Sequence, residues 1–241
     1  MCENCGCSAK APVEDPKEPQ TLEVLQNLLE KNDRQAEENK RHFTQENVYS
    51  VNLMSSPGSG KTSLIEKTIE WMNGQKRIGV IEGDLETNKD VERILAKGVP
   101  AFQITTGQTC HLDAQMVHRG IHHLPLQELD IVFVENVGNL VCPASYDLGT
   151  HLNVVLLSVT EGDDKPAKYP VIFRRADLLL ITKIDLIEHL DFKMETAIEE
   201  AKKINPKLEV IALSSRTGEG IQAWIDQLNR RTSLGARVGR G

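Results

Sequence analysis

The chain has 241 residues, of which 39% are hydrophobic and 4% aromatic, and a formal net charge of −7. This suits one α/β domain or two small ones, and an acidic surface of mixed charge excludes nucleic acid as the main partner, because phosphate backbones are bound by basic surfaces. The sequence contains no apolar run of about 18 residues and no signal-peptide pattern, so we expect a cytoplasmic protein without membrane insertion.

Three of the five cysteines stand in the opening residues MCENCGC. In a reducing compartment, clustered thiols bind metal or take part in redox chemistry more often than they form disulfides. Cys2, Cys5, Cys7 and the terminal amine make a set of one nitrogen and three sulfur donors, and soft donors near one plane favour Ni²⁺. The alternatives are a flexible redox tail and a structural zinc site, which would lack one side-chain ligand. The sequence leaves open whether Met1 is retained.

Proline and charged residues dominate residues 8–20, which predicts a disordered linker. Leucines then recur at helical spacing within residues 21–43, at positions 22, 25 and 29. This pattern predicts an amphipathic helix whose apolar first half docks on the domain, with a partner-binding helix as the alternative. The expected organisation is a metal-binding tail and linker over residues 1–20, one folded domain over 21–230 that carries the motifs described below, and a disordered Gly/Arg-rich tail over 231–241.

From residue 49 onward, short runs rich in β-forming residues alternate with helix-length segments. Several runs are apolar on both faces, as in a parallel sheet covered by helices. The alternation predicts an α/β fold of the P-loop NTPase kind, with a mostly parallel seven-stranded sheet and helices on both faces. The predicted strands are YSVNLM, RIGVIEG, AFQI, DIVFVEN, NVVLLSV, DLLLITK and LEVIAL.

The first predicted strand runs into SSPGSGKTS, which matches the core of a phosphate-binding P-loop. Glycines let backbone N–H groups turn toward phosphate oxygens, and the N-terminus of the next helix adds partial positive charge. Lys61 is predicted to reach the β- and γ-phosphates, and the Thr62 hydroxyl to ligate Mg²⁺. Ser55 replaces the usual first glycine, and a glycine-rich turn without a ligand is the alternative. The predicted nucleotide-binding residues here are Gly58, Ser59, Gly60, Lys61, Thr62 and Ser63.

The segment ITKID indicates which base is bound, because Lys183 and Asp185 fit a guanine-binding signature. A carboxylate at 185 can accept hydrogen bonds from the N1–H and the amino group of guanine, and the lysine stem can lie on the base plane. Thr182 stands where asparagine is common. After the last predicted strand, Ser215 and Arg216 in LSSRTGEG take the place of a second guanine loop. The order of the three elements predicts GTP rather than ATP.

Two further predicted strands end in acidic residues that are candidates for binding the Mg²⁺ ion of the nucleotide. DIVFVENVG places Glu135 and Gly138 where GTPases have Asp-x-x-Gly, an acid for the Mg²⁺ shell and a glycine that senses the γ-phosphate. Asp84, at the end of RIGVIEGD, is a candidate to bind Mg²⁺ or to position water, with capping of the next helix as the alternative. We predict Lys61, Asp84 and Glu135 as catalytic residues. No glutamine is evident to orient water, which predicts slow intrinsic hydrolysis.

Cys110 and His111 are adjacent in TTGQTCHLDAQ, and Cys142 follows the predicted switch glycine by four residues. Each thiol alone is more often a packed core residue, but two thiolates and an imidazole together suit Zn²⁺ or Ni²⁺ rather than Mg²⁺. We therefore predict an inner metal site whose geometry depends on the nucleotide state. His118, His122 and His123 on the following helix are weaker candidates for metal ligands, and we interpret them by default as exposed helix residues.

Taken together, these motifs resemble the HypB family, the nickel-insertion GTPases of nickel–iron hydrogenase maturation. The resemblance covers the first seven residues and roughly residues 48–230, and adds GDLETNKD and EGDDKPAKYP to the motifs above. It implies a metallochaperone that uses GTP/GDP with Mg²⁺, carries Ni²⁺, and dimerises when GTP binds. It also implies a Zn²⁺ or Ni²⁺ site from Cys110, His111 and Cys142 near the dimer interface, and dimer contacts around Lys165 and Lys168. The implied partners are a HypA-type metallochaperone and the hydrogenase large-subunit precursor.

Three alternatives stay open. A urease-accessory GTPase is similar, but that family places its ligands as Cys-Pro-His, whereas this chain reads Cys142-Pro143-Ala144. A nucleotide-gated scaffold would bind partners and no metal. A structural zinc protein with an incidental P-loop would show no effect of GTP on metal affinity.

Overall fold

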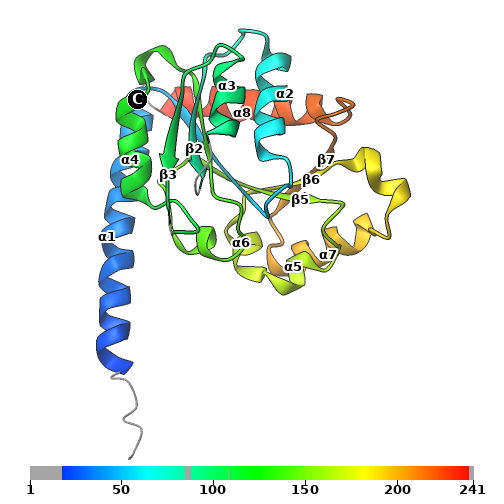
Figure 1. The fold of residues 1–241 in the computed structure, drawn as a ribbon, viewed down its shortest axis with the longest axis horizontal. Helices are drawn as coiled ribbons and strands as arrows, with labels where there is room; N and C mark the ends of the chain where they lie inside the picture. Colours follow the sequence, from blue (N-terminus) through cyan, green and yellow to red (C-terminus); the bar gives the residue numbers. More distant parts are fainter. Residues whose placement is uncertain (1–17, 85–87, 108, 239–241) are drawn as a thin grey trace, which may run out of the picture.

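The computed structural model describes residues 18–84, 88–107 and 109–238, and the side chains of residues 26–84, 88–107 and 109–233. A seven-stranded sheet forms its centre, in the order β3-β2-β4-β1-β5-β6-β7, and every neighbouring pair is parallel (Figure 1). The predicted fold class and all seven predicted strands are thereby confirmed. The strands are β1 (Tyr49–Ser55), β2 (Ile78–Asp84), β3 (Ala101–Thr105), β4 (Ile131–Glu135), β5 (Leu152–Ser158), β6 (Leu178–Thr182) and β7 (Glu209–Leu213).

Helices cover both faces of the sheet (Figure 1). One face packs against α2, α3 and α8, and the other against α1 and α4 at one end and α6 and α7 at the other. The helices are α1 (Glu18–Gln45), α2 (Lys61–Met72), α3 (Lys89–Leu95), α4 (Ala114–His123), α5 (Lys165–Lys168), α6 (Pro170–Arg175), α7 (Met194–Ile204) and α8 (Ile221–Val238), with 3₁₀ turns η1 (Leu126–Glu128), η2 (Cys142–Ser145) and η3 (Ile184–His189). No helix in these ranges is both long and apolar enough to cross a membrane.

Alternation along the strands builds two cores from one sheet. In β5, Val154 and Leu156 pack toward α2 and α8, whereas Val155 and Leu157 pack toward α6 and α7. Burial of each such side chain contributes about 1.5–3 kcal/mol, which explains why the central strands are apolar on both faces. Trp224 of α8 is fully buried, and its indole N–H donates to the Thr68 hydroxyl at 2.9 Å.

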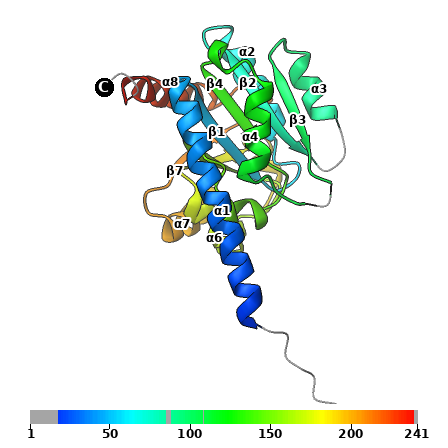
Figure 2. The same ribbon diagram turned by 90° about the vertical axis from the view of Figure 1, so that its left-hand side faces the viewer.

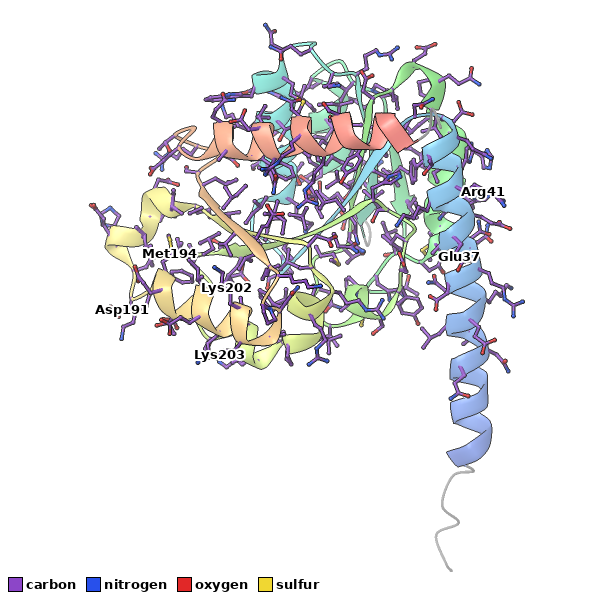
Figure 3. The ribbon with its side chains drawn as sticks, turned by 180° about the vertical axis from the view of Figure 1, so that it is seen from behind. Glu37, Arg41, Asp191, Met194, Lys202 and Lys203 are labelled. Atoms are coloured by element: carbon purple, nitrogen blue, oxygen red, sulfur yellow. The ribbon has the colours of Figure 1, made fainter. Side chains whose placement is uncertain are left out.

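The long helix α1 docks through its second half, not through the apolar first half that the leucine spacing predicts. Leu28 is 55% exposed and Leu29 37% exposed, and the first half extends past the body of the domain (Figures 1 and 2). The residues that bury against α4 and its neighbouring loops are Asn32, Ala36, Asn39 and Phe43. Two of these are amides that bond to loop backbone, so a hydrophobic period does not detect them. Glu37 and Arg41 lie on the exposed part of the same helix (Figure 3).

The first and last helices extend beyond the expected boundaries of the GTPase domain at residues 21 and 230. Helix α1 begins at Glu18 rather than at 21, with Pro19 in its first turn, where the missing N–H leaves no hydrogen bond unmade. Helix α8 continues to Val238, past the expected boundary at 230, because Arg231 pairs with Glu209 at 2.6 Å and Thr232 is buried. The predicted N-terminal metal motif and most of the predicted linker lie outside the described residues.

Parallel strands bring their carboxyl ends to one edge of the sheet, which is where ligands bind in open α/β folds. Ser55, Asp84, Glu135 and Thr182 are the last residues of β1, β2, β4 and β6. This edge therefore collects residues that lie far apart in the sequence.

Candidate functional site

The predicted P-loop joins β1 to α2 at this edge. Gly58 and Gly60 have φ values of 75° and 98°, a left-handed backbone that side chains rarely adopt, so both turns require glycine. Helix α2 begins directly after Gly60, which points its free N–H groups into the loop. The Lys61 ammonium is buried and donates to the Ser55 hydroxyl at 3.2 Å. The serine that departs from the usual pattern thus holds the lysine side chain.

A cluster of carboxylates lies beside the loop. The Thr62 hydroxyl donates to Glu135 Oε1 at 2.8 Å, and Glu135 pairs in register with Glu82 on the neighbouring strand. Burial raises the pKa of Glu135 to about 7, against the opposing effects of Lys61 and Thr62. Burial, followed by the charges of Glu135 and Asp84, raises the pKa of Glu82 to about 8.

One oxygen of each buried glutamate has no hydrogen-bond partner, namely Oε2 of Glu82 and Oε2 of Glu135. Buried carboxylates kept close together without partners fit a site for a divalent cation. Sequence reasoning missed Glu82, although an acid inside the apolar run VIEGD was a signal for it. The alternative role of Asp84 is not observed, because Asn88 occupies the N-cap of α3.

The predicted base-binding residues and residues of the P-loop line one pocket of about 220 Å³. The Lys183 ammonium donates to the Gly58 carbonyl at 2.6 Å, and the Thr182 hydroxyl donates to the Ser59 carbonyl at 2.8 Å. Threonine in place of the common asparagine therefore still ties this loop to the phosphate loop. The pocket is lined by Ser59, Gly60, Ser63, Thr182, Lys183, Asp185, Leu186, Ser214, Ser215 and Arg216.

Glu161 is a second residue of this region that sequence reasoning missed. Its Oε1 accepts hydrogen bonds from the Ser59 hydroxyl at 2.6 Å and from the Ser158 backbone N–H at 3.0 Å. The carboxylate thereby fixes the middle of the P-loop against the end of β5. The nearby Lys165 and Lys168 stay outside the pocket: one lies over the Tyr169 ring, and the other pairs with Asp164.

The predicted switch glycine touches the phosphate loop. A Cβ built on Gly138 would lie 2.9 Å from Pro57 Cα and 3.0 Å from Pro57 N. Any side chain at 138 would therefore push the P-loop away, and only glycine allows the two loops to pack this closely. The two loops are therefore in direct contact at this point.

Cys110, His111 and Cys142 come together at the same edge. One ligand atom from each lies within 4.8 Å of the other two, and the two sulfur atoms are 2.8 Å apart. The imidazole of His111 stacks on Tyr146 with a centroid distance of 4.0 Å, and its buried Nδ1 has no partner. Burial lowers the pKa of His111, which favours the uncharged imidazole that metals bind. A hydrogen bond with Cys110 raises the pKa of Cys142. The donor set fits a Zn²⁺ or Ni²⁺ ion.

Two asparagines join this cluster to residues 136–141, the segment around Gly138 that is called the switch segment below. Asn136 Oδ1 accepts from the backbone N–H of Leu112 at 3.1 Å and of Val137 at 3.0 Å. Asn139 donates to the Cys110 carbonyl at 3.3 Å and accepts from Val141 N at 2.8 Å. The residues on either side of Gly138 are thus bonded to the loop that carries Cys110 and His111. Sequence reasoning did not predict either asparagine.

The histidines of α4 differ from their predicted exposure. His122 and His123 are exposed, but His118 is half-buried because it packs against Asn39 of α1. Cys2, Cys5 and Cys7 lie outside the described residues, so the N-terminal site stays a prediction.

The sequence and fold of this chain are similar to those of known proteins. The model of the CobW/HypB/UreG nucleotide-binding domain matches residues 49–212. The hydrogenase maturation factor HypB of Azotobacter vinelandii is 49% identical over 232 residues, which are 95% of this chain and 77% of the relative. The hydrogenase/urease maturation factor HypB of Helicobacter pylori strain J99 is 42% identical over 205 residues, 83% of this chain and 84% of the relative.

A solved structure of a relative has the same fold. The crystal structure of HypB from Helicobacter pylori in complex with nickel has a TM-score of 0.82 and 41% identity, and the match covers 85% of this chain and 96% of that one. With the P-loop, the paired acids and the thiol–imidazole cluster on one edge of the sheet, the chain belongs to the CobW/HypB/UreG family and, within it, to the HypB hydrogenase maturation factors.

Proposed function

We propose that this chain is a GTP-hydrolysing metallochaperone that carries nickel for the maturation of nickel–iron hydrogenase. The observation that carries the proposal is the contact between two loops: the segment that bonds to the backbone of Cys110 and Leu112, on either side of His111, also contains Gly138, which packs on Pro57 of the phosphate loop. A metal cluster and a nucleotide loop in contact suit a carrier whose hold on its cargo depends on GTP. The names of the relatives support hydrogenase as the destination.

GTP is the proposed nucleotide. The glycine turns at 58 and 60 direct backbone N–H groups at the phosphates, and Lys61 supplies positive charge where negative charge develops. Asp185 lines the same pocket as Ser59 and Gly60 of the P-loop, and its carboxylate can accept hydrogen bonds from guanine. Ser215 and Arg216 border the same pocket.

Hydrolysis uses a cation held by the acids beside the loop. The Thr62 hydroxyl, Glu135 and Asp84, with Glu82 behind them, are oxygen donors of the kind Mg²⁺ prefers. Thr62, Asp84 and Glu135 would hold Mg²⁺ here, and the ion would supply positive charge to the phosphate group. Lys61 would bind the phosphate oxygens directly, whereas Asp84 and Glu135 would act through the cation that they hold. No glutamine lines the described pocket, and slow intrinsic turnover fits this.

Nickel is the proposed cargo, and two places could hold it. The N-terminal Cys2, Cys5 and Cys7 offer soft donors in a set that favours Ni²⁺. The cluster of Cys110, His111 and Cys142 suits either Ni²⁺ or Zn²⁺. We place the chain in the cytoplasm, where thiols stay reduced.

The proposed partners are a HypA-type metallochaperone, the hydrogenase large-subunit precursor and a second copy of this chain. GTP is proposed to favour the dimer, because contacts to the γ-phosphate order the switch segment that borders the metal cluster. The segment with Lys165 and Lys168 is a proposed dimer contact. Sedimentation velocity with GDP and with a non-hydrolysable GTP analogue should show a larger dimer fraction in the second; equal fractions would contradict this assembly.

Base specificity tests the proposed function most directly. Asp185→Asn is expected to weaken GTP binding by about 1–3 kcal/mol, because an amide replaces a charged acceptor. The same variant should gain affinity for xanthosine triphosphate, whose 2-oxo group accepts from the new amide N–H. Calorimetric titration of both nucleotides against parent and variant measures the exchange.

A matched control is available a few residues away. Asp191 is also an aspartate near η3 but is exposed at the start of the α7 region (Figure 3). Asp191→Asn should leave both affinities unchanged. The assignment fails if Asp185→Asn binds GTP as tightly as the parent, or if the parent prefers ATP.

A further inference from the structure

Three of the seven histidines gather where α1 packs on α4, and none of them belongs to the cluster of Cys110, His111 and Cys142. His118 and His122 are four residues apart, so they share one face of α4, and His42 faces them from α1. One ring nitrogen from each lies within 4.8 Å of the other two. The rings of His118 and His122 meet edge-on with centroids 4.6 Å apart, and those of His42 and His122 are 5.4 Å apart.

Asn39 determines which nitrogen of His118 carries the proton. This asparagine is fully buried, and its Nδ2 donates to the carbonyls of Ala114 at 2.8 Å and Leu148 at 3.1 Å. Both amide hydrogens are thereby used, and Oδ1 must be the atom that faces His118 Nδ1 at 3.0 Å. Because an amide oxygen only accepts, His118 donates from Nδ1 and keeps a lone pair on Nε2.

This arrangement is the one in which proteins prepare a histidine to bind metal: one ring nitrogen donates to a fixed acceptor, and the other is free to coordinate. Burial, followed by the neighbouring His122 and His42, lowers the pKa of His118 and favours its uncharged form. Glu38 acts in the opposite direction.

The spacing also fits a metal ion. His118 Nε2 lies 3.2 Å from His122 Nε2, a hydrogen bond that a metal ion would replace. Two imidazoles bound to Zn²⁺ at 2.0–2.1 Å with a tetrahedral angle have nitrogens about 3.3 Å apart. A ring nitrogen of the half-buried His42 lies within 4.8 Å of both.

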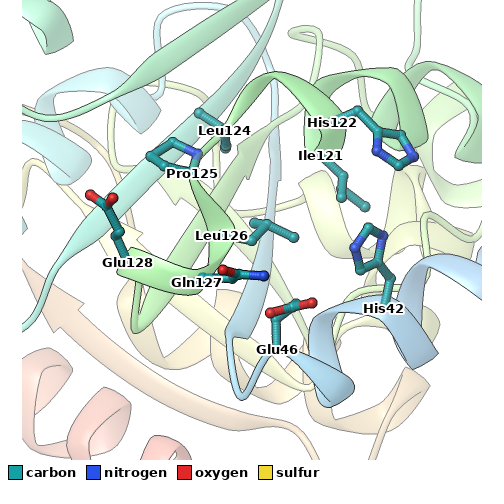
Figure 4. A pocket seen from close by; sticks show the side chains of 9 residues that line it. All are labelled: His42, Glu46, Ile121, His122, Leu124, Pro125, Leu126, Gln127 and Glu128. Atoms are coloured by element: carbon teal, nitrogen blue, oxygen red, sulfur yellow. The ribbon is translucent and has the colours of Figure 1, made fainter.

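A pocket of about 310 Å³ opens in front of the cluster, lined by His42, His122 and Glu46 among others (Figure 4). It leaves room for water as a fourth ligand, and the Glu46 carboxylate supplies a negative charge near the bound cation. A neutral three-imidazole set with an open position suits Zn²⁺ and its neighbours in the first transition row.

We propose that His42, His118 and His122 form a third metal site, specific for a divalent transition-metal ion such as Zn²⁺, which clamps α1 onto α4. The site contains no sulfur and shares no residue with the cluster of Cys110, His111 and Cys142. It goes beyond the proposed function and does not depend on nucleotide hydrolysis.

The test uses the full chain with all five cysteines replaced by alanine, kept in GDP, and titrated with ZnCl₂ and CoCl₂. One Zn²⁺ per chain should bind, and Co²⁺ should give d–d absorption without a sulfur charge-transfer band. His122→Ala should weaken binding more than about tenfold, and His42→Ala and His118→Ala likewise. His123→Ala is the matched control, because His123 is on the same helix but stacks on Phe102 and bonds to the Arg119 carbonyl. Its binding should be unchanged.

A second measurement keeps the cysteines, in case their removal disturbs the fold. Metal content per chain at saturating Zn²⁺ should fall by one ion in His122→Ala and not in His123→Ala. No binding by a folded cysteine-free chain, equal loss in the two variants, or unchanged metal content in His122→Ala would overturn the site.

Discussion

Replacement of Lys61 by alanine is expected to lower GTP turnover by about 10²–10³-fold, the usual cost of removing one preorganised charge that stabilises a transition state. The ammonium is buried and donates to the Ser55 hydroxyl within the phosphate loop, so its position serves a ligand more than the fold. Single-turnover hydrolysis of GTP with Mg²⁺ measures the loss, and thermal unfolding of the nucleotide-free chain should change by only a few degrees.

Lys67 provides the matched control for this variant. It lies on the same helix, but it is paired with Glu70 at the surface, at 2.9 Å. Exposed pairs of this kind contribute about 0–1 kcal/mol, so Lys67→Ala should retain both turnover and stability. Equal turnover in parent and Lys61→Ala would remove the P-loop from the proposed mechanism.

Metal affinity at Cys110, His111 and Cys142 is expected to differ between the GDP and GTP states by about 1–3 kcal/mol, or 5–150-fold. The physical path is short: Gly138 packs on Pro57, and Asn136 and Asn139 bond the switch segment to the loop with the ligands. By linkage, metal must change the affinity for the nucleotide by the same factor.

The measurement uses a chain with Cys2, Cys5 and Cys7 replaced by alanine, titrated with Co²⁺ in GDP and in a non-hydrolysable GTP analogue. The sulfur charge-transfer band reports this site alone, since imidazole sites lack it. Cys142→Ala should abolish the band and keep GTP binding. Asn139→Ala, which removes the bond to the Cys110 carbonyl but no ligand, should keep the band and reduce the difference between nucleotides. Identical affinities in the two states of the parent would refute the coupling.

Local chemistry in the sequence was sufficient for the strands and for the phosphate loop. β5 and β6 are read correctly because a strand covered on both faces is apolar throughout, and the glycine turns are read correctly because positive φ leaves few other choices. The prediction of which half of α1 docks was wrong for the opposite reason. Asn32 and Asn39 dock by hydrogen bonds, which leave no hydrophobic periodicity in the sequence.

Short sequence motifs likewise identified most candidate ligand-binding residues. In the structure, Asp185 and Arg216 line the same pocket as residues of the P-loop. The roles of these residues in nucleotide binding are predictions, which the titrations above test. The sequence analysis missed the supporting residues, and only Glu82 left a local signal, as an acid inside an apolar run. Glu82, Glu161, Asn136 and Asn139 act through partners that are 24 or more residues away, or on another strand, and no spacing along the chain encodes such contacts.

The sequence by itself determined the family, the parallel α/β fold and the donor types available, because these depend on patterns within a few residues. Only the tertiary structure decided which donors meet. His42 is separated from His118 by 76 positions, yet packing of α1 on α4 puts their nitrogens within 4.8 Å. Cys110 and Cys142 meet because β3 and β4 end at the same edge of one sheet. Side chains from distant segments become a site only when the core has fixed the elements that carry them, and that energy comes from burial across the whole domain rather than from the motif itself.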